Sequence, residues 1–224
     1  GVMHACGHDG HTTMLLGAAR YLAETRNFAG DAVVIFQPAE EGGAGAVAMI
    51  KDGLMDRFGI EQVYGMHNGP GIPVGAFALR PGPIMAGGDA VVIKIEGRGG
   101  HAAHPNKCID SVLVGAQLIT ALQSIVSRSV DPLESAVISM CEFHAGNARN
   151  VIPQTAELAG TVRTLNGEVR KMVERRVREV VAGVAQITGA RIDLTYDRGY
   201  PVTVNHAEQT DVARFWEYSL PAIY

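Results

Sequence analysis

The chain has 224 residues, of which 47% are hydrophobic and 19% charged, and its formal net charge is −4 at pH 7. This composition excludes a disordered chain and is sufficient for one large or two modest hydrophobic cores. Interspersed acidic and basic residues give no electrostatic reason to expect nucleic acid or an anionic membrane as a partner. No leader pattern and no apolar run near the roughly 20 residues that span a bilayer is seen, so we expect a cytoplasmic protein.

The cysteines are odd in number and widely spaced, which argues against a disulfide framework and for a reducing compartment. Cys108 and Cys141 have apolar neighbours and are predicted to be buried thiols, whereas Cys6 stands among histidines. Because the chain begins at Gly1, only a few residues before this polar cluster, we expect it to be a fragment of a longer protein.

The first part of the chain alternates helix and strand patterns. A helix is predicted from Thr12 or Thr13 to about Glu24, because apolar residues recur three and four positions apart. The run DAVVIFQ at 31–37 is typical of a strand buried on both faces of a parallel sheet. A second helix is expected at 44–56, and further strands at 61–67 and 74–80. This alternation indicates an α/β fold.

Prolines and glycines concentrate at 81–88, where we place a domain boundary. The expected domains are 1–84, 85–200 and a truncated return segment at 201–224. The second domain is predicted to follow the β-α-β-β-α-β order of ferredoxin-like domains. Its expected elements are a strand at 90–96, a helix at about 109–127, strands at about 136–144 and 156–163, a helix at 168–188 and a strand at 191–196.

The helix expected at 168–188 has a clear amphipathic pattern. Its predicted buried stripe comprises Val169, Met172, Val173, Val177, Val180, Val184 and Ile187. The intervening charges, including Arg170, are interpreted as a solvated face.

The stretch HACGHDGH, residues 4–11, gathers side chains that bind metals. In open α/β sheets, sites form where strands end. Glu40 and Glu41 follow one expected strand, and His67 ends another. Thiolate, imidazole and carboxylate together suit Zn, Mn, Co or Ni rather than Mg or Ca. Cys6 and His8 alternate in sequence and are therefore the favoured ligands of the stretch.

Simpler interpretations remain open for each residue alone. His67 could be a structural histidine, the Glu40–Glu41 pair a solvated loop, and Asp9 a helix cap. His4 and His11 are less clearly directed toward a metal than Cys6 and His8, and are predicted to support the ligands or cap the helix. A cysteine nucleophile at Cys6 is also conceivable, but the surrounding ligand candidates favour coordination.

The motifs MHACGHDGHT, FQPAEEGGAGA and YGMHNGP resemble those of metal-dependent amidohydrolases. That group is typified by hippurate hydrolase, N-acyl-amino-acid amidohydrolases and indole-acetyl-amino-acid hydrolases, relatives of the aminoacylases and carboxypeptidases. The segments GRGGHAAHP and NVIPQTAELAGTVR are similar to its dimerisation-domain signatures, so the resemblance extends to about residue 205. It implies a catalytic domain that holds two metal ions and carries an inserted ferredoxin-like domain, which pairs two subunits as a homodimer.

The resemblance also implies roles for individual residues. Two divalent ions (Mn, Zn, Co or Ni) would be held by Cys6, His8, Glu41 and His67. Glu40 would be the general base toward a metal-activated water, and the reaction would be hydrolysis of the amide bond of N-acyl or N-aroyl amino acids. His101 would be a catalytic donor to the developing oxyanion across the dimer interface, while Asn150 and Arg163 would bind substrate.

Some sequence features depart from this family pattern. Relatives have a further ligating histidine near the C-terminus and sheet strands before the first motif, and His206 lacks the expected surroundings. A catalytically inactive remnant that acts only as a dimerisation module is therefore an alternative. A cysteine-nucleophile hydrolase ranks last. Without the resemblance, His101 is interpreted as an ordinary surface histidine and Arg163 as an ion-pair partner.

Overall fold

The computed structural model describes residues 2 and 4–219. The chain divides into two compact units, Gly1–Ala78 and Leu79–Tyr224. The end of the expected return segment, residues 220–224, lies outside the described residues.

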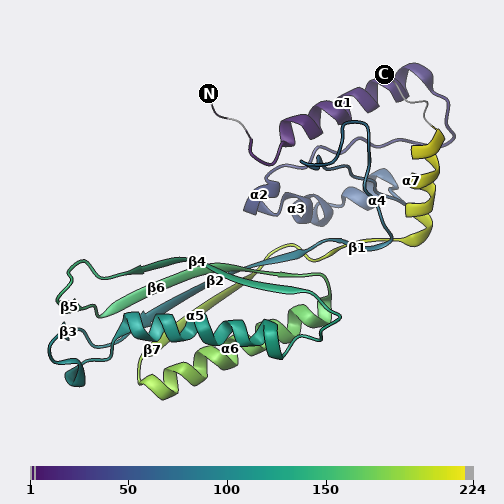
Figure 1. Ribbon diagram of the computed structural model, residues 1–224. Coiled ribbons are helices and arrows are strands. Elements are labelled where there is room, and N and C mark those ends of the chain that lie inside the picture. Colours follow the sequence, from purple (N-terminus) through teal and green to yellow (C-terminus); the bar gives the residue numbers. More distant parts are fainter. Residues whose placement is uncertain (1, 3, 220–224) are drawn as a thin grey trace. The chain divides into compact units, whose positions relative to one another are not determined.

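The described part of the first unit contains helices and irregular segments (Figure 1). Its helices are α1 (His8–Thr25), α2 (Glu40–Gly43), α3 (Gly45–Lys51) and α4 (Leu54–Phe58). Helix α1 begins at His8 rather than at the expected Thr12 or Thr13, because Gly7 adopts a left-handed φ of 75° as its N-cap. The hydroxyl of Thr12 donates to the carbonyl of His8, at 3.0 Å, from inside the helix.

The helix expected at 44–56 is two short helices, α3 and α4. Gly53 separates them with a φ of 85°, a left-handed conformation that a continuous right-handed helix does not accommodate.

The three strands expected in the first unit are not formed. Among the described residues 2 and 4–78, none is assigned to a strand, and only Gly45 is buried. The segments 31–37, 61–67 and 74–80 have the right composition, but a strand also needs a hydrogen-bonded neighbour and these segments have no ladder partner. Composition alone was therefore insufficient here.

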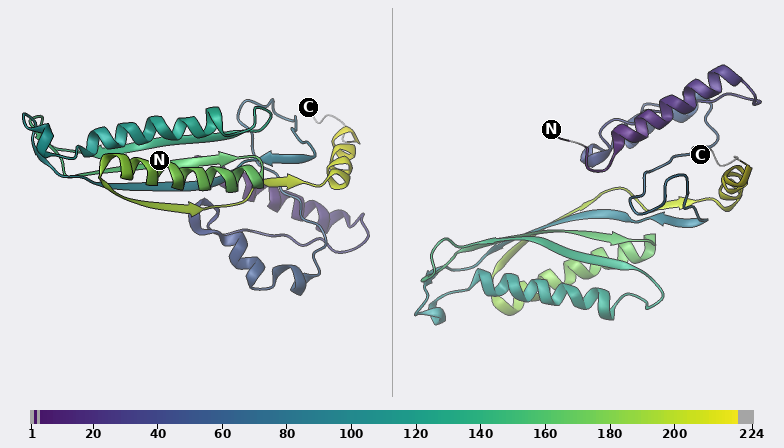
Figure 2. Two further views of the ribbon diagram at one scale, coloured as in Figure 1. Left: turned by 90° about the horizontal axis from the view of Figure 1, so that it is seen from below. Right: turned by 45° about the horizontal axis from the view of Figure 1, so that its top comes forward.

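The second unit contains a four-stranded antiparallel sheet with the order β4-β6-β2-β7. Along the chain, its elements follow the expected β-α-β-β-α-β order. They are β2 (Gly87–Glu96), α5 (Ser111–Arg128), β4 (Ala136–Ala145), β6 (Thr155–Thr164), α6 (Gly167–Thr188) and β7 (Arg191–Arg198). Figures 1 and 2 show α5 and α6 covering one face of this sheet. The chain is therefore α/β, with its described strands confined to the second unit.

The hydrophobic core of the second unit lies between the sheet and these helices. Val91, Ile93 and Ile95 alternate along β2 on the face that the helices cover. The fully buried side chains of α5 include Leu118, Leu122 and Ile125.

The buried face of α6 differs in part from the predicted stripe. Its buried residues are Val173, Val177 and Val181, whereas Ile187 is 84% exposed. Ile187 lies in the last turn, beyond the part of the helix that contacts the core. The prediction was therefore correct at Val173 and Val177, missed Val181 and was wrong at Ile187.

Short paired segments complete the second unit. Within the expected boundary stretch, β1 (Gly82–Met85) pairs antiparallel with β8 (Thr203–Asn205). At the other end of the sheet, β3 (Gly100–His101) pairs with β5 (Val151–Ile152), next to the 3-10 helix η1 (Pro105–Lys107). Helix α7 (Ala207–Ser219) follows β8.

One described helix, α5, is long and apolar enough to cross a membrane by length and composition. This differs from the expectation that no segment approaches that length. Its apolar side packs in the core of the second unit, however, through Val114, Leu118, Leu122 and Ile125. A core helix of this kind passes the same test, so the finding is weak evidence for a membrane span.

Asp89 is the centre of a buried polar network. It is 3% exposed and accepts hydrogen bonds from Arg170 Nε (3.0 Å), Tyr196 Oη (2.9 Å) and the main-chain N–H of Gly199 (3.3 Å). Burial and the hydrogen bond to Asp89 raise the pKa of Tyr196. Arg170 was expected on a solvated face. Its side chain instead forms an ion pair with Asp89, because an unpaired buried charge would destabilise the fold.

Other side chains reach the surface against expectation. Cys141, predicted to be buried, is exposed. The register of β4 with β6 shifts between Met140 and Glu142, so no residue of β6 lies opposite Cys141.

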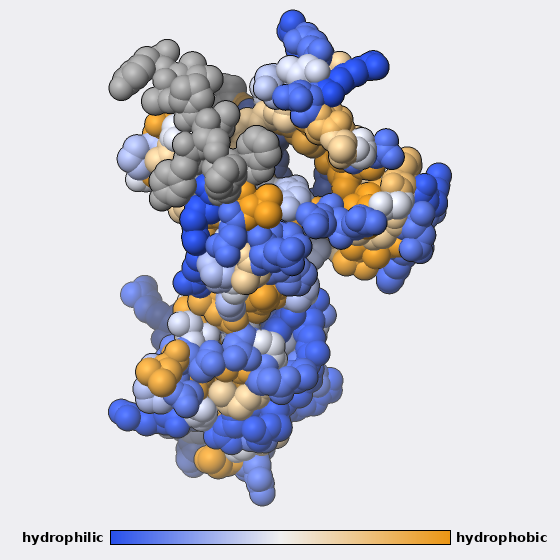
Figure 3. Space-filling model, turned by 90° about the vertical axis from the view of Figure 1, so that its right-hand side faces the viewer, coloured by the Kyte–Doolittle hydropathy of each residue, from blue (hydrophilic) through white to orange (hydrophobic). Residues whose placement is uncertain are grey.

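Figure 3 shows apolar side chains interspersed with hydrophilic ones on the visible face.

Candidate metal centre

The candidate metal centre begins at the turn before α1. The main-chain N–H of Gly7 donates to the carbonyl of His4 at 3.0 Å and closes a turn, after which His8 opens the helix. Because Gly7 takes the left-handed conformation, the chain reverses between Cys6 and His8. The two favoured ligands of the sequence motif therefore lie on either side of one glycine.

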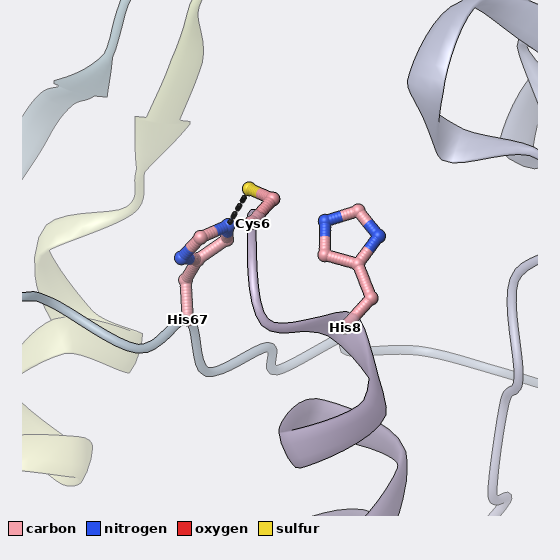
Figure 4. A group of neighbouring side chains, drawn as sticks. All are labelled: Cys6, His8 and His67. Carbon is pink, nitrogen blue, oxygen red and sulfur yellow. Dashed lines mark hydrogen bonds between the residues drawn. The ribbon is translucent and has the colours of Figure 1, made fainter. Parts of the chain in front are cut away.

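Cys6, His8 and His67 form one potential cation site, and their ligand atoms lie within 4.8 Å of one another. Cys6 Sγ is 3.3 Å from His67 Nε2, and Figure 4 shows one ring nitrogen of His8 directed toward the same space. Two segments far apart in sequence thus supply a thiol and two imidazoles. This is a donor set that suits Zn or a similar transition metal.

The carboxylates expected beside these ligands are also present. His8 Nε2 lies 3.7 Å from Glu40 Oε2 and 3.8 Å from Glu41 Oε1. Helix α2 is irregular, since Ala39 has a φ of 47° and Glu41 a ψ of 79°, and this irregular backbone brings both carboxylates to His8. The structure therefore brings together Cys6, His8, Glu40, Glu41 and His67.

His4, which the sequence did not favour as a ligand, is a member of a second potential site. His4, His8 and Glu41 also offer ligand atoms within 4.8 Å of one another, and the rings of His4 and His8 stack at 4.2 Å. The turn closed by Gly7 places His4 beside His8. The glycine at position 7 was the sequence signal for this turn.

The environment of Cys6 favours a protonated thiol when no cation is present. Partial burial raises its pKa, and the charges of Glu41 and Glu40 raise the pKa further. A nucleophilic cysteine needs the opposite shift, toward the thiolate, so the surroundings weigh against the cysteine-nucleophile alternative. A bound divalent cation would displace the proton, as it does from coordinating thiols in general.

Two of the other predicted residues lie together at one end of the second unit. His101 ends β3, opposite Val151, and the carbonyl of Asn150 accepts the N–H of Ala102 at 3.0 Å. The N–H of Ala103 donates to His101 Nδ1 at 3.1 Å. The neutral ring therefore carries its proton on Nε2, where it is available to a further acceptor.

Arg163 lies at the opposite end of β6 from the Asn150 loop. It pairs in register with Val137 on one side and with Gly88 on the other, and its guanidinium lies against Gly88. From Thr155 to Arg163 the strand spans roughly 26 Å at about 3.3 Å per residue. Within this chain, Arg163 is therefore remote from His101 and Asn150.

A sequence profile of Peptidase family M20/M25/M40 matches residues 1–215. The chain belongs to this family. The match includes the whole first unit and the second unit up to residue 215. As expected from the motifs at 3–12, 36–46 and 64–70, similar proteins include hydrolases of the amidohydrolase and carboxypeptidase type.

Relatives of this M20 chain include a hippurate hydrolase from Campylobacter jejuni subsp. jejuni serotype O:2, which is 48% identical over 212 residues. That alignment covers 95% of the chain and 55% of the relative. An N-acetyl-L-cysteine deacetylase from Bacillus subtilis is 44% identical over 215 residues, which are 96% of the chain and 51% of the relative. The chain thus spans about half the length of these curated relatives.

Solved structures agree with the assignment. A dinuclear metal-binding peptidase of the M20 family from Bacillus subtilis matches with a TM-score of 0.76 at 35% identity. The match covers 97% of this chain and 55% of that one.

Proposed function

We propose that the protein of this M20 chain hydrolyses the amide bond of N-acyl or N-aroyl amino acids, releasing a carboxylic acid and a free amino acid. The convergence of Cys6, His8 and His67 within 4.8 Å, with Glu40 and Glu41 beside them, supports a metal-dependent reaction. The names of the similar proteins, hippurate hydrolase and N-acetyl-L-cysteine deacetylase, support amide substrates of this class.

Cys6, His8, Glu41 and His67 are the proposed ligands of two divalent cations, drawn from Mn, Zn, Co and Ni. Their thiol, imidazole and carboxylate donors fit such ions, and the structural neighbour described as dinuclear supports the number two. When bound, the cations supply Lewis acidity toward the amide carbonyl and toward water.

Glu40 is the proposed general base. Its neighbour Glu41 lies equally near His8, so one carboxylate can serve as a ligand while the other handles protons. Glu40 would accept a proton from the attacking water. It would then return the proton to the nitrogen of the departing amine, which leaves as the free amino acid.

The second unit supplies the proposed substrate contacts. His101, with its proton on Nε2, would donate to the developing oxyanion. Asn150 and Arg163 would hold the substrate, and Arg163 would bind the carboxylate of the substrate. Because Arg163 and Asn150 lie at opposite ends of β6, one small substrate cannot reach both within one subunit. Contributions from two subunits of a homodimer would resolve this separation.

The proposed domain roles follow from this arrangement. Residues 1–84 would be part of the catalytic domain, 85–200 a ferredoxin-like dimerisation domain, and 201–224 a return segment. Dimerisation is supported by β4, a strand at the edge of the sheet, and by the exposed side of α5, which carries no charge before Arg128 in its last turn. The uncharged part of that side includes Leu113, Ala116, Gln117, Thr120 and Ser124.

Substitution of Glu40 by glutamine in the full-length protein tests the proposal. We expect the turnover of N-acetyl and N-benzoyl amino acids to fall by about 10²–10⁴-fold, because a positioned base contributes about that much. The content of bound metal should stay unchanged, since Glu41 is kept. Glu61→Gln, at an exposed glutamate of the same unit, is the matched control and should retain activity.

Three results would contradict the proposal. Unchanged turnover in Glu40→Gln would remove Glu40 from the mechanism. A metal-free dimer without hydrolysis would support the dimerisation remnant. Activity that resists chelators but disappears when Cys6 is alkylated would support the cysteine nucleophile.

A further inference from the structure

His11 connects helix α1 to the segment that carries His67. Its Nε2 atom lies 3.0 Å from the main-chain nitrogen of Asn68 and 2.6 Å from the side-chain oxygen of the same residue. A main-chain N–H can only donate, so Nε2 of His11 accepts there. The side-chain oxygen of Asn68 contacts the same ring, so both the main chain and the side chain of Asn68 lie against His11.

Asn68 in turn fixes the ring of its neighbour His67. Nδ1 of His67 lies 2.8 Å from the carbonyl oxygen of Asn68, and a carbonyl oxygen only accepts. The proton of neutral His67 therefore sits on Nδ1. Nε2, which faces Cys6 Sγ at 3.3 Å, therefore carries the lone pair of the ring.

Gly7 holds the other side of Asn68. A Cβ atom at Gly7 would come within 2.7 Å of Asn68 Nδ2, so the amide occupies the space that any other residue would fill. Asn68 is thus held between Gly7, in the turn before α1, and the side chain of His11, in the first turns of α1.

We propose that His11 is a positioning residue of the metal centre: through Asn68 it sets the orientation and the tautomer of His67. The inference rests on the proposed function, because it takes Cys6 and His67 to be cation ligands. His11 belongs to neither group of potential ligands among the described residues, although its ring lies 4.3 Å from that of His67. Its Nε2 atom is already engaged by Asn68.

Residues that orient a metal-binding histidine contribute measurably to the affinity for the cation. Substitutions of groups that orient metal-binding histidines typically lower affinity by about 10–100-fold. Without His11, the 67–68 segment would lose its hydrogen bonds to α1. His67 would then have to be ordered at the moment of binding, so part of the binding free energy would be lost.

Titration of the full-length protein with Co²⁺ tests the inference, with absorption as the readout. The thiolate-to-cobalt charge-transfer band reports Cys6, and the ligand-field bands report the geometry of the other ligands. We expect His11→Ala to weaken Co²⁺ binding by about 10–100-fold and to change the ligand-field bands, while the charge-transfer band still develops at saturation. Circular dichroism of each variant verifies its fold.

Two further variants separate positioning from ligation and from general loss of structure. His11→Gln keeps an acceptor near the position of Nε2 but is a poor ligand, so it should restore most of the affinity. Thr13→Ala removes a hydroxyl that bonds only within α1, to the carbonyl of Asp9, and should bind Co²⁺ as the wild type does.

The outcomes distinguish this inference from the proposed function. Wild-type affinity in His11→Ala, with Cys6→Ala abolishing the charge-transfer band, would overturn the role of His11 and leave the metal centre standing. Equal losses in His11→Ala and His11→Gln, with fewer cations bound, would make His11 a ligand and overturn positioning. Absence of any Co²⁺ binding by the wild type would overturn both.

Discussion

At the scale of single residues, Asp89 shows how one buried carboxylate organises its surroundings. Arg170, Tyr196 and Gly199 all donate to it, from helix α6, strand β7 and the residue after β7. Asp89→Asn would leave Arg170 with a charge that is no longer compensated. We expect it to lower the free energy of unfolding by about 3–5 kcal/mol, as when one partner of a buried pair is removed.

The control for this prediction is Tyr196→Phe, which removes one hydrogen bond from the same carboxylate. It should cost about 1 kcal/mol, and urea denaturation of both variants provides the comparison. A loss in Asp89→Asn no larger than that in Tyr196→Phe would mean that the ion pair adds nothing to the stability of the second unit.

At the scale of elements, helix α5 shows the difference between its two sides. Leu118 is fully buried against the sheet, whereas Leu113, on the same helix, is 56% exposed. We expect Leu118→Ala to lower the free energy of unfolding by about 2–5 kcal/mol, through lost burial and the cavity that remains. Leu113→Ala, the matched control, should change it by less than about 0.5 kcal/mol. Similar losses in both would contradict the packing of α5 on the sheet.

At the scale of the whole molecule, the two units differ in how much they bury. The buried hydrophobic core described above belongs entirely to the second unit, between Val91 and Tyr196. Elements with few buried contacts open at low free energy, so amide hydrogen exchange should be faster in the first unit than in the second.

A divalent cation should change this pattern in the first unit alone. Addition of Zn²⁺ or Mn²⁺ is expected to slow amide hydrogen exchange at residues 4–11 and 67–68. A cation that binds only the folded state stabilises the segments that hold its ligands. Exchange in β2 and β6 should not change. Equal protection of both units, or of neither, would contradict a cation site built from Cys6, His8 and His67.

The sequence by itself determined the order of elements in the second unit and the donor chemistry of the candidate site. Alternation along β2 and the three-to-four spacing in α5 and α6 are local signals, since each records which side of an element is buried. The motif at 4–11, with Glu40, Glu41 and His67, likewise carried its donor chemistry in the residue types.

Only the tertiary structure decided the rest. Strands were expected at 31–37, 61–67 and 74–80 but are absent, because strand formation depends on neighbours that no local pattern encodes. Arg170 was assigned to solvent and is paired with Asp89, which lies 81 positions earlier in the chain. His4 and His11 gained specific places only through the turn at Gly7 and the contact with Asn68. Residue types fix what a side chain can bind, while the path of the backbone fixes which side chains meet.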